Sequence, residues 1–308
     1  INKFRGDKTI LDPGIVMLEE RGGIPVVGVT PYMQVEIEDE DSLTERFNMT
    51  KGGKGAEERI GLVDIAVIRT PRISNFTDFM LLENAPGVNL RYVKNPRELR
   101  NPDMIILPGT KNTMGDLKWL RQSGMEAKIL KAHAGGCVVW GICGGYQMMG
   151  QEVLDPEHVE GDIERLPGLG LLPISTRMSG EKVTRQVKFG LCNPHSPSST
   201  LRSPLMQGYE IHMGVTTPVE GTPDSPLNLL ENGSTDGYYV DSTCMGTYIH
   251  GILDNPEFID FLLAPFADKL SGNAGAFDYH TFKEEQYDKL ANLVRKHVDM
   301  DYIYRQLV

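Results

Sequence analysis

The chain has 308 residues, enough for two domains of ordinary size and a full hydrophobic core. Hydrophobic residues make up 40% of the sequence and charged residues 24%, close to globular averages, which excludes a disordered or collagen-like chain. The 31 basic and 42 acidic residues give a net charge of −11, which argues against non-specific binding to nucleic acid or to an anionic membrane surface.

The sequence also lacks the usual marks of membrane insertion and secretion. No apolar run approaches the ~18 residues that span a bilayer, and the charged first five residues are not those of a signal peptide. Four cysteines without a CxxC pair fit neither a disulfide framework nor a zinc site. We therefore expect a soluble, cytoplasmic protein with no metal site.

The first 35 residues have the pattern of one strand–helix–strand unit. Residues 1–4 predict the end of a buried strand and residues 25–29 predict a second strand. Between them, Asp12 as N-cap and Pro13 at the first helical position predict a helix that ends at Gly22 and Gly23. Because one such unit cannot close a core alone, we interpret it as the tail of an α/β domain whose front half lies outside this sequence.

The remainder of the chain divides by composition and periodicity. Acidic residues at 36–45 and glycines at 51–55 indicate a linker, and from residue 59 the alternation of strands and helices predicts a parallel sheet covered by helices. The predicted strands are 63–68, 90–93, 104–107 and 137–142, and the predicted helices are 75–82, 114–120, 126–132, 257–266 and 282–307. Antiparallel hairpins are expected at 182–189, 208–216 and 237–249. The expected domain boundaries are 1–47, a linker at 48–59, 60–265 and a helical segment at 266–308.

The most informative residues lie where a buried strand meets a helix, in the sequence GICGGYQ at 141–147. The pattern G-x-C-x-G is that of a nucleophile elbow, in which glycines two positions either side of the reactive residue avoid steric collisions. The helix that follows would point its N–H groups at the Cys143 sulfur and favour the thiolate. We predict Cys143 as a nucleophile, with the Gly144 N–H as a donor to an oxyanion.

A cysteine nucleophile needs a base, and His250 is the best candidate among the seven histidines. It lies in GTYIHG at 246–251, at the exit of an apolar strand. His212 shares one strand face with Glu210, so this pair is a candidate for orienting the catalytic residues or for a structural role.

These motifs resemble the class I glutamine amidotransferase family. GICGGYQ at 141–147 and GTYIHG at 246–251 are similar to its two catalytic motifs, and PGTKNT at 108–113 and GYEIHMG at 208–214 are similar to its cobyric acid synthase branch. Residues 1–47 resemble the end of the P-loop-like α/β synthetase domain of that branch. The implied fold is α/β, with a class I glutamine amidotransferase-like sheet covered by helices and preceded by the tail of the synthetase domain.

The resemblance implies that Cys143 hydrolyses glutamine and that the ammonia passes to the synthetase domain. There, ATP with Mg²⁺ activates carboxylates of a corrinoid substrate, adenosylcobyrinic acid a,c-diamide, for amidation in cobalamin synthesis. The oxyanion would lie between Gly144 and the loop of Gly109, which ends the neighbouring strand at the same sheet edge. Asn2 and Lys3 match a stretch that contacts the nucleotide base in the family.

Two departures from the family pattern affect these expectations. The sequence contains no phosphate-binding loop, so the amino-terminal synthetase half would be a missing partner, and this chain alone should bind ATP poorly. Many amidotransferases complete a triad with a Glu two residues after the His, but here that position is Ile252.

Three alternatives stay open. One is a synthase of the cobyrinic acid a,c-diamide type, which shares the architecture. The second is a cysteine hydrolase on the same fold, against which the strand–helix–strand unit at the start argues. The third is a domain that binds glutamine or a tetrapyrrole without turnover.

Overall fold

The computed structural model describes residues 1–33, 62–192, 205–270 and 279–307. The chain divides into two compact units, one of Ile1–Asp39 with Asp278–Val308 and one of Glu40–Phe277. The sequence did not predict that residues from Asp278 onward group with the amino-terminal residues. The expected linker at 48–59 lies outside the described residues.

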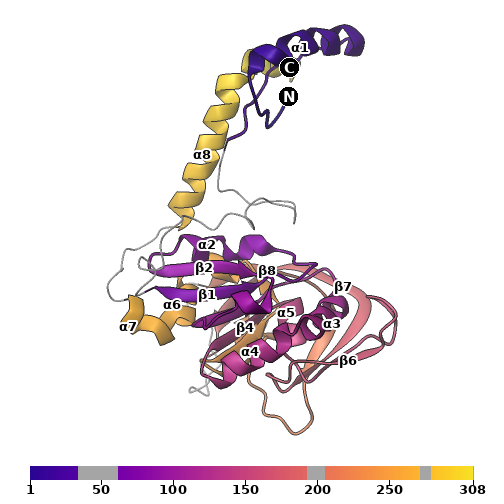
Figure 1. Ribbon diagram of the computed structural model, residues 1–308, viewed down its shortest axis with the longest axis vertical. Coiled ribbons are helices and arrows are strands. Elements are labelled where there is room, and N and C mark those ends of the chain that lie inside the picture. Colours follow the sequence, from indigo (N-terminus) through magenta and orange to yellow (C-terminus); the bar gives the residue numbers. More distant parts are fainter. Residues whose placement is uncertain (34–61, 193–204, 271–278, 308) are drawn as a thin grey trace. The chain divides into compact units, whose positions relative to one another are not determined.

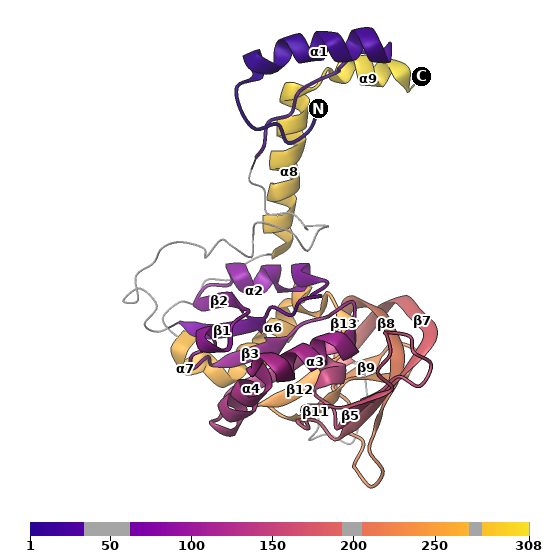
Figure 2. The ribbon, with the colours of Figure 1, turned by 45° about the vertical axis from the view of Figure 1, so that its right-hand side comes forward.

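Helices dominate the smaller unit: α1 (Lys8–Gly22), α8 (Tyr279–His297) and α9 (Met300–Gln306) (Figures 1 and 2). The predicted start of α1 is wrong. Asp7 caps the helix by accepting a hydrogen bond from the Thr9 N–H, so the helix begins earlier, and Pro13 lies inside it. The predicted end is confirmed, because Gly23 adopts φ 65° and caps the helix.

The two short strands predicted beside α1 are wrong as strands, because only isolated bridges form there. Phe4 bridges Pro31 in the parallel direction, and the Phe4 N–H donates to the Thr30 carbonyl at 2.9 Å. Gly28 instead bridges Val298, where the expected helix 282–307 is interrupted between α8 and α9. A single bridge on each side of a segment is too little pairing to extend a strand.

The larger unit is built on a six-stranded sheet with the order β11-β12-β4-β3-β1-β2. All neighbouring pairs are parallel except β11 with β12. The predicted hairpin at 237–249 is thus only partly correct, since β12 also extends the parallel sheet beside β4. The strands are β1 (Val63–Ile68), β2 (Val88–Val93), β3 (Met104–Leu107), β4 (Val138–Ile142), β11 (Tyr238–Asp241) and β12 (Cys244–Thr247).

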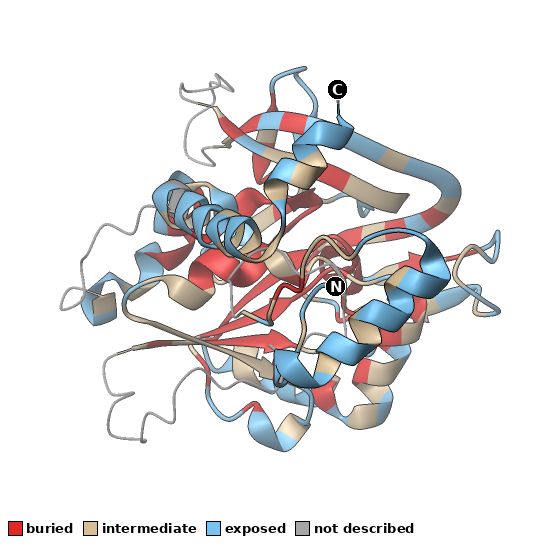
Figure 3. Ribbon diagram, turned by 90° about the horizontal axis from the view of Figure 1, so that it is seen from above, coloured by how far each residue is buried: buried red, intermediate tan, exposed pale blue. Residues whose placement is uncertain are grey.

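Helices cover both faces of this sheet, as the apolar strands predict (Figure 3). Alternate residues of β3 and β4, such as Ile105 and Val139, belong to one core cluster with residues of α3 and α4. Trp140 packs instead against Phe258 of α6, with ring centroids 5.5 Å apart. The helices and 3₁₀ turns here are η3 (Phe76–Phe79), α2 (Met80–Asn84), η4 (Pro96–Glu98), α3 (Thr113–Ser123), α4 (Met125–Ala134), α5 (Gly144–Met148), η5 (Ile252–Asp254), α6 (Pro256–Leu263), η6 (Ala264–Phe266) and α7 (Ala267–Leu270).

A second, mostly antiparallel sheet is built chiefly from strands within residues 152–236, which are inserted in the chain between two strands of the first sheet. Its longest strands pair antiparallel, as the hairpin pattern predicts, although both extend further than expected. The short strand β13 adds to β8, with His250 opposite Tyr209. The strands are β5 (Glu152–Leu154), β6 (Arg165–Pro167), β7 (Ile174–Leu191), β8 (Met206–Pro218), β9 (Asn228–Leu230), β10 (Thr235–Asp236) and β13 (Ile249–His250).

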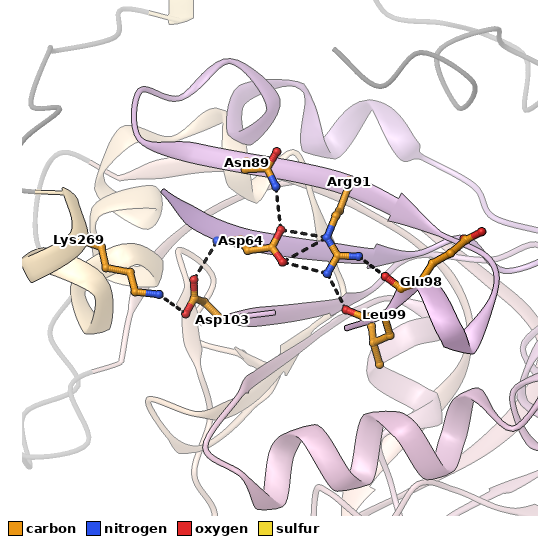
Figure 4. Close-up of polar contacts among 7 residues, drawn as sticks. All are labelled: Asp64, Asn89, Arg91, Glu98, Leu99, Asp103 and Lys269. Atoms are coloured by element: carbon orange, nitrogen blue, oxygen red, sulfur yellow. Dashed lines mark hydrogen bonds and ion pairs between the residues drawn. The ribbon is translucent and has the colours of Figure 1, made fainter. Parts of the chain in front are cut away.

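The amino-terminal edge of the parallel sheet is held by a polar cluster (Figure 4). Arg91 of β2 donates to both carboxylate oxygens of Asp64 on β1 and to the backbone oxygens of Glu98 and Leu99. Asp103, just before β3, accepts from the Asp64 N–H at 2.9 Å. These contacts fix the strand register at this edge, and the predicted catalytic residues lie at the opposite, carboxyl edge.

Candidate active site

Cys143 lies in a sharp turn between β4 and α5. Its backbone has φ 51° and ψ −112°, a conformation that residues with a side chain rarely adopt. The side chain is buried, and its sulfur lies 3.7 Å from the Ile211 carbonyl oxygen of β8. The elbow predicted from the glycine spacing is therefore present in the structure.

The glycines on either side of Cys143 have no room for a side chain. A methyl group at Gly141 would lie 2.6 Å from the Met149 sulfur, and one at Gly145 would lie 2.0 Å from the Leu107 backbone oxygen. The second contact is with strand backbone, which cannot move aside cheaply. Strand β3 and helix α5 thus approach each other closely only because residue 145 is glycine.

This contact predicts that Gly145→Ala destabilises the fold. We expect the free energy of unfolding to fall by about 1–3 kcal/mol or more, because the methyl group overpacks a rigid site. Gly180→Ala is the matched control: it has no neighbour within 4 Å of the added methyl group, and the change should be within about 0.5 kcal/mol. Urea denaturation of both variants measures the difference, and equal stability would contradict the prediction.

His250 is held beside the elbow by a buried carboxylate. Its Nδ1 lies 2.7 Å from Oδ2 of Asp78, and the other carboxylate oxygen accepts from the Gly251 N–H at 3.0 Å. His250 is 1% exposed and Asp78 4%. Burial lowers the pKa of His250, but the charge and hydrogen bond of Asp78 and the interaction with Cys143 outweigh it and raise the pKa to about 10. With Nδ1 bound to Asp78, Nε2 is the nitrogen left for Cys143.

Asp78 was missed by the sequence analysis. It precedes His250 by 172 residues, in η3, whereas the family pattern directs attention to the buried Ile252 after the histidine. The available signal was a lone carboxylate in the apolar run FTDFMLL at 76–82, whose neighbours Phe76 and Phe79 are buried. A buried carboxylate needs hydrogen-bond partners. A histidine is one such partner, and the carboxylate then orients its imidazole ring.

The raised pKa of His250 predicts a pH-dependent effect of Asp78→Asn. Between the ordinary value of 6.5 and about 10, the folded protein keeps a proton that the unfolded chain loses. The stabilisation by the charged pair is therefore complete below pH 6.5 and is lost as the pH rises toward about 10. Without the Asp78 charge, burial lowers the pKa of His250. We expect the stability advantage of the wild type over Asp78→Asn to shrink over this range in urea denaturation; a constant difference would contradict this.

An aromatic ring covers one face of the His250 imidazole. Tyr209 stacks on it with centroids 5.3 Å apart and an interplanar angle of 23°. The Tyr209 hydroxyl accepts a hydrogen bond from Asn75 Nδ2 at 2.8 Å. Asn75 precedes η3, so one segment supplies both Asp78 and a contact to the ring that covers His250.

The predicted oxyanion residues Gly144 and Gly109 both lie at this site. A methyl group at Gly109 would lie 3.1 Å from Cε1 of His250, so this glycine leaves room for the imidazole. A methyl group at Gly144 would lie 3.3 Å from the Thr110 backbone nitrogen. The backbone nitrogen of Thr110, one residue after Gly109, thus lies close to Gly144.

Glu210 and His212 lie on β8 beside the site but contact other residues. Glu210 is buried and forms an ion pair with Arg185. His212 stacks on Tyr248, with centroids 3.7 Å apart, and burial lowers its pKa despite the charge of Glu210. An orienting role for this pair stays a prediction.

Asn2 and Lys3 belong to the smaller unit, where both are exposed and the Lys3 N–H donates to the Asn2 side chain. Across the described ranges, no group of three or more His, Cys, Asp or Glu side chains could hold a metal ion. No helix in the same residues is long and apolar enough to cross a membrane.

Comparison with known proteins gives a family and several relatives. A family model described as a CobB/CobQ-like glutamine amidotransferase domain matches residues 64–258. The cobyric acid synthase of Bacteroides fragilis is 56% identical over 308 residues, which cover 100% of this chain and 59% of that protein. That of Phocaeicola vulgatus is 49% identical over 306 residues, 99% of this chain and 59% of the relative. The chain therefore spans about 59% of the length of these relatives. A solved structure, PurLQS from Thermotoga maritima, has 19% identity and a TM-score of 0.49, and covers 66% of this chain and 98% of that chain.

Proposed function

Because the chain belongs to the CobB/CobQ-like glutamine amidotransferase family, we propose that it hydrolyses the side-chain amide of glutamine at Cys143. The observation that carries this proposal is the buried His250–Asp78 pair beside a cysteine in an elbow turn. A buried cysteine with only a structural role needs neither the strained backbone nor an oriented imidazole.

In the first step, the thiol proton is held on the imidazole of His250, whose pKa is raised to about 10, and the sulfur of Cys143 attacks the amide carbon of glutamine. The carbonyl oxygen becomes an oxyanion, which accepts hydrogen bonds from the N–H groups of Gly144 and Thr110. The tetrahedral intermediate collapses when the carbon–nitrogen bond breaks, and His250 gives its proton to the nitrogen. Ammonia leaves, and the glutamyl group stays bound to sulfur as a thioester.

In the second step, water hydrolyses the thioester. His250 takes a proton from the water, the hydroxide adds to the thioester carbon, and the carbon–sulfur bond breaks to release glutamate. Asp78 accepts the hydrogen bond from Nδ1 of His250 in both steps. It holds the imidazole with Nε2 toward the sulfur and stabilises the imidazolium of each step. Both steps thus use one base, one nucleophile and one pair of backbone donors.

The relatives suggest a use for the ammonia. Since they are cobyric acid synthases, the proposed wider reaction is ATP-dependent amidation of the carboxylates of adenosylcobyrinic acid a,c-diamide. ATP with Mg²⁺ and the corrinoid would bind in the synthetase part of the protein, to which Asn2 and Lys3 would contribute a contact with the base. No step of glutamine hydrolysis at Cys143 requires ATP or the corrinoid.

Glutamate and ammonia released from glutamine test the proposal directly. We expect equal amounts of both products, and no products from asparagine, whose amide carbon lies one methylene closer to the α-carbon. The purified chain should be assayed alone and with a synthetase segment from a relative. Hydrolysis of asparagine or of peptide amides at the same rate would favour a general cysteine hydrolase, and no release in either mixture would reject the proposal.

A further inference from the structure

Another buried carboxylate lies next to the candidate active site, on helix α3. Asp116 of α3 has 0% exposure. Its Oδ2 accepts hydrogen bonds from the Thr110 hydroxyl at 2.6 Å and from the Arg72 backbone N–H at 3.2 Å. Its Oδ1 lies 3.5 Å from the Arg72 guanidinium. Two backbone segments reach the site, residues 72–74 and residues 109–111, and we call them the two arms. Each arm is therefore bound to the Asp116 carboxylate.

The two arms also pair with each other. The Ser74 N–H donates to the Gly109 carbonyl at 2.9 Å, and the Lys111 N–H donates to the Arg72 carbonyl at 3.0 Å. These bonds flank the antiparallel bridge between Ile73 and Thr110. In a pair of this kind the two central residues point their own N–H groups away from each other.

The Thr110 N–H therefore points away from the arm of Ile73 and toward the elbow. Contacts at Gly144 agree, because a methyl group there would lie 2.4 Å from Thr110 Cγ2 and 3.3 Å from the Thr110 nitrogen. The Thr110 side chain is thus held between Gly144, which faces its methyl group, and Asp116, which accepts from its hydroxyl. Its torsion angles and the direction of its N–H are fixed together.

We propose that Asp116 is a positioning residue that aims the Thr110 N–H at the oxyanion. This proposal rests on the proposed glutamine hydrolysis at Cys143. A carboxylate is costly to bury and is retained where its hydrogen bonds hold a defined geometry. Asp116 acts through Thr110 and Arg72, not on the substrate. Its loss should therefore impair the transition state, where the oxyanion forms, and leave glutamine binding nearly unchanged.

Asp116→Leu and Asp116→Asn form a matched pair of variants. Leu has a similar size but accepts no hydrogen bond, whereas the Asn carbonyl can take the place of Oδ2, on which both donors converge. Removal of an oxyanion donor lowers kcat about 100- to 1,000-fold in other enzymes, so misalignment in Asp116→Leu should lower it about 10- to 100-fold. KM should change less than about threefold, and Asp116→Asn should recover most of the loss in kcat.

Two reactions of the cysteine separate positioning from general damage to the site. Alkylation by iodoacetamide forms no oxyanion, so its rate in Asp116→Leu should match that of the wild type. The thiol adds to the aldehyde carbon of glutamate γ-semialdehyde and forms a tetrahedral hemithioacetal, whose oxygen lies where the oxyanion would lie. The inhibition constant of this aldehyde should therefore weaken about 10- to 100-fold in Asp116→Leu, in parallel with kcat.

Thr110→Val keeps the shape of Thr110 without the hydroxyl and covers the case in which Asp116→Leu does not fold. It should also lower kcat, and the double variant should lose no more than Asp116→Leu alone, because Asp116→Leu already removes the hydrogen bond that Thr110→Val removes. An active wild type with Asp116→Leu and Thr110→Val equally active would overturn the positioning role. A wild type without glutaminase activity would instead reject the proposed function.

Discussion

Cys143→Ala is expected to abolish glutamine hydrolysis, lowering kcat by at least about 10⁴-fold, because the thioester forms on the Cys143 sulfur. Cys137→Ala, Cys192→Ala and Cys244→Ala should keep most of the activity. Burial raises the pKa of the thiols of Cys137 and Cys244 to about 12, so they hold little thiolate at neutral pH. Burial also raises the pKa of Cys192.

Initial rates of glutamate release from the four variants measure this expectation. Circular dichroism of each variant confirms that a lost rate is not a lost fold. Substantial activity in Cys143→Ala, or loss of activity in Cys137→Ala with the fold intact, would show that the nucleophile has been assigned to the wrong residue.

The second large effect concerns His250 against His212. His250→Ala should remove turnover almost completely, by about 10³-fold or more, because the leaving nitrogen then has no acid and the thiol no base. His212→Ala should keep measurable activity, since its ring stacks on Tyr248 and its strand neighbour Glu210 is paired with Arg185. Any loss there should come from the lost stacking contact.

Steady-state rates of both histidine variants, with Asp78→Ala as a third, decide between these roles. Asp78→Ala should lower the steady-state rate less than His250→Ala does, because the imidazole remains but loses its orienting partner. Equal and complete loss in His250→Ala and His212→Ala would leave the base unassigned and make the Glu210 and His212 face a candidate for orienting the site.

The parts of the site that the sequence predicted depend on residues close together in the chain. The elbow follows from the glycines two positions either side of Cys143, and the contact that a methyl group at Gly141 would make, with Met149, lies within the same strand–turn–helix unit. His250 follows from its position at the end of an apolar strand. Such local patterns restrict the backbone conformation around the residue, so its position in the site can be predicted from the sequence alone.

Asp78 and Asp116 could not be assigned from the sequence, because their roles depend on contacts across the fold. Asp78 meets His250 over a separation of 172 residues. In the sequence, Asp116 resembles any polar residue of an amphipathic helix. Its contacts with Arg72 and Thr110 form only because residues 72–74 pair with residues 109–111 in the fold.

The errors near the amino terminus have a different physical reason. Residues 1–4 and 25–29 have strand-like composition, but each finds only a single bridge, so propensity alone does not form a strand. The start of α1 was placed by Pro13, whereas the Asp7 cap had the stronger effect.

The most direct test of the central claim is labelling with a chloroketone analogue of glutamine, followed by mass spectrometry of the intact chain and of its peptides. The account predicts one adduct per chain, on Cys143, formed much more slowly when glutamine is present in excess or when His250 is replaced by Ala. An adduct on Cys137, Cys192 or Cys244 in the folded wild type, or labelling that glutamine does not slow, would contradict it.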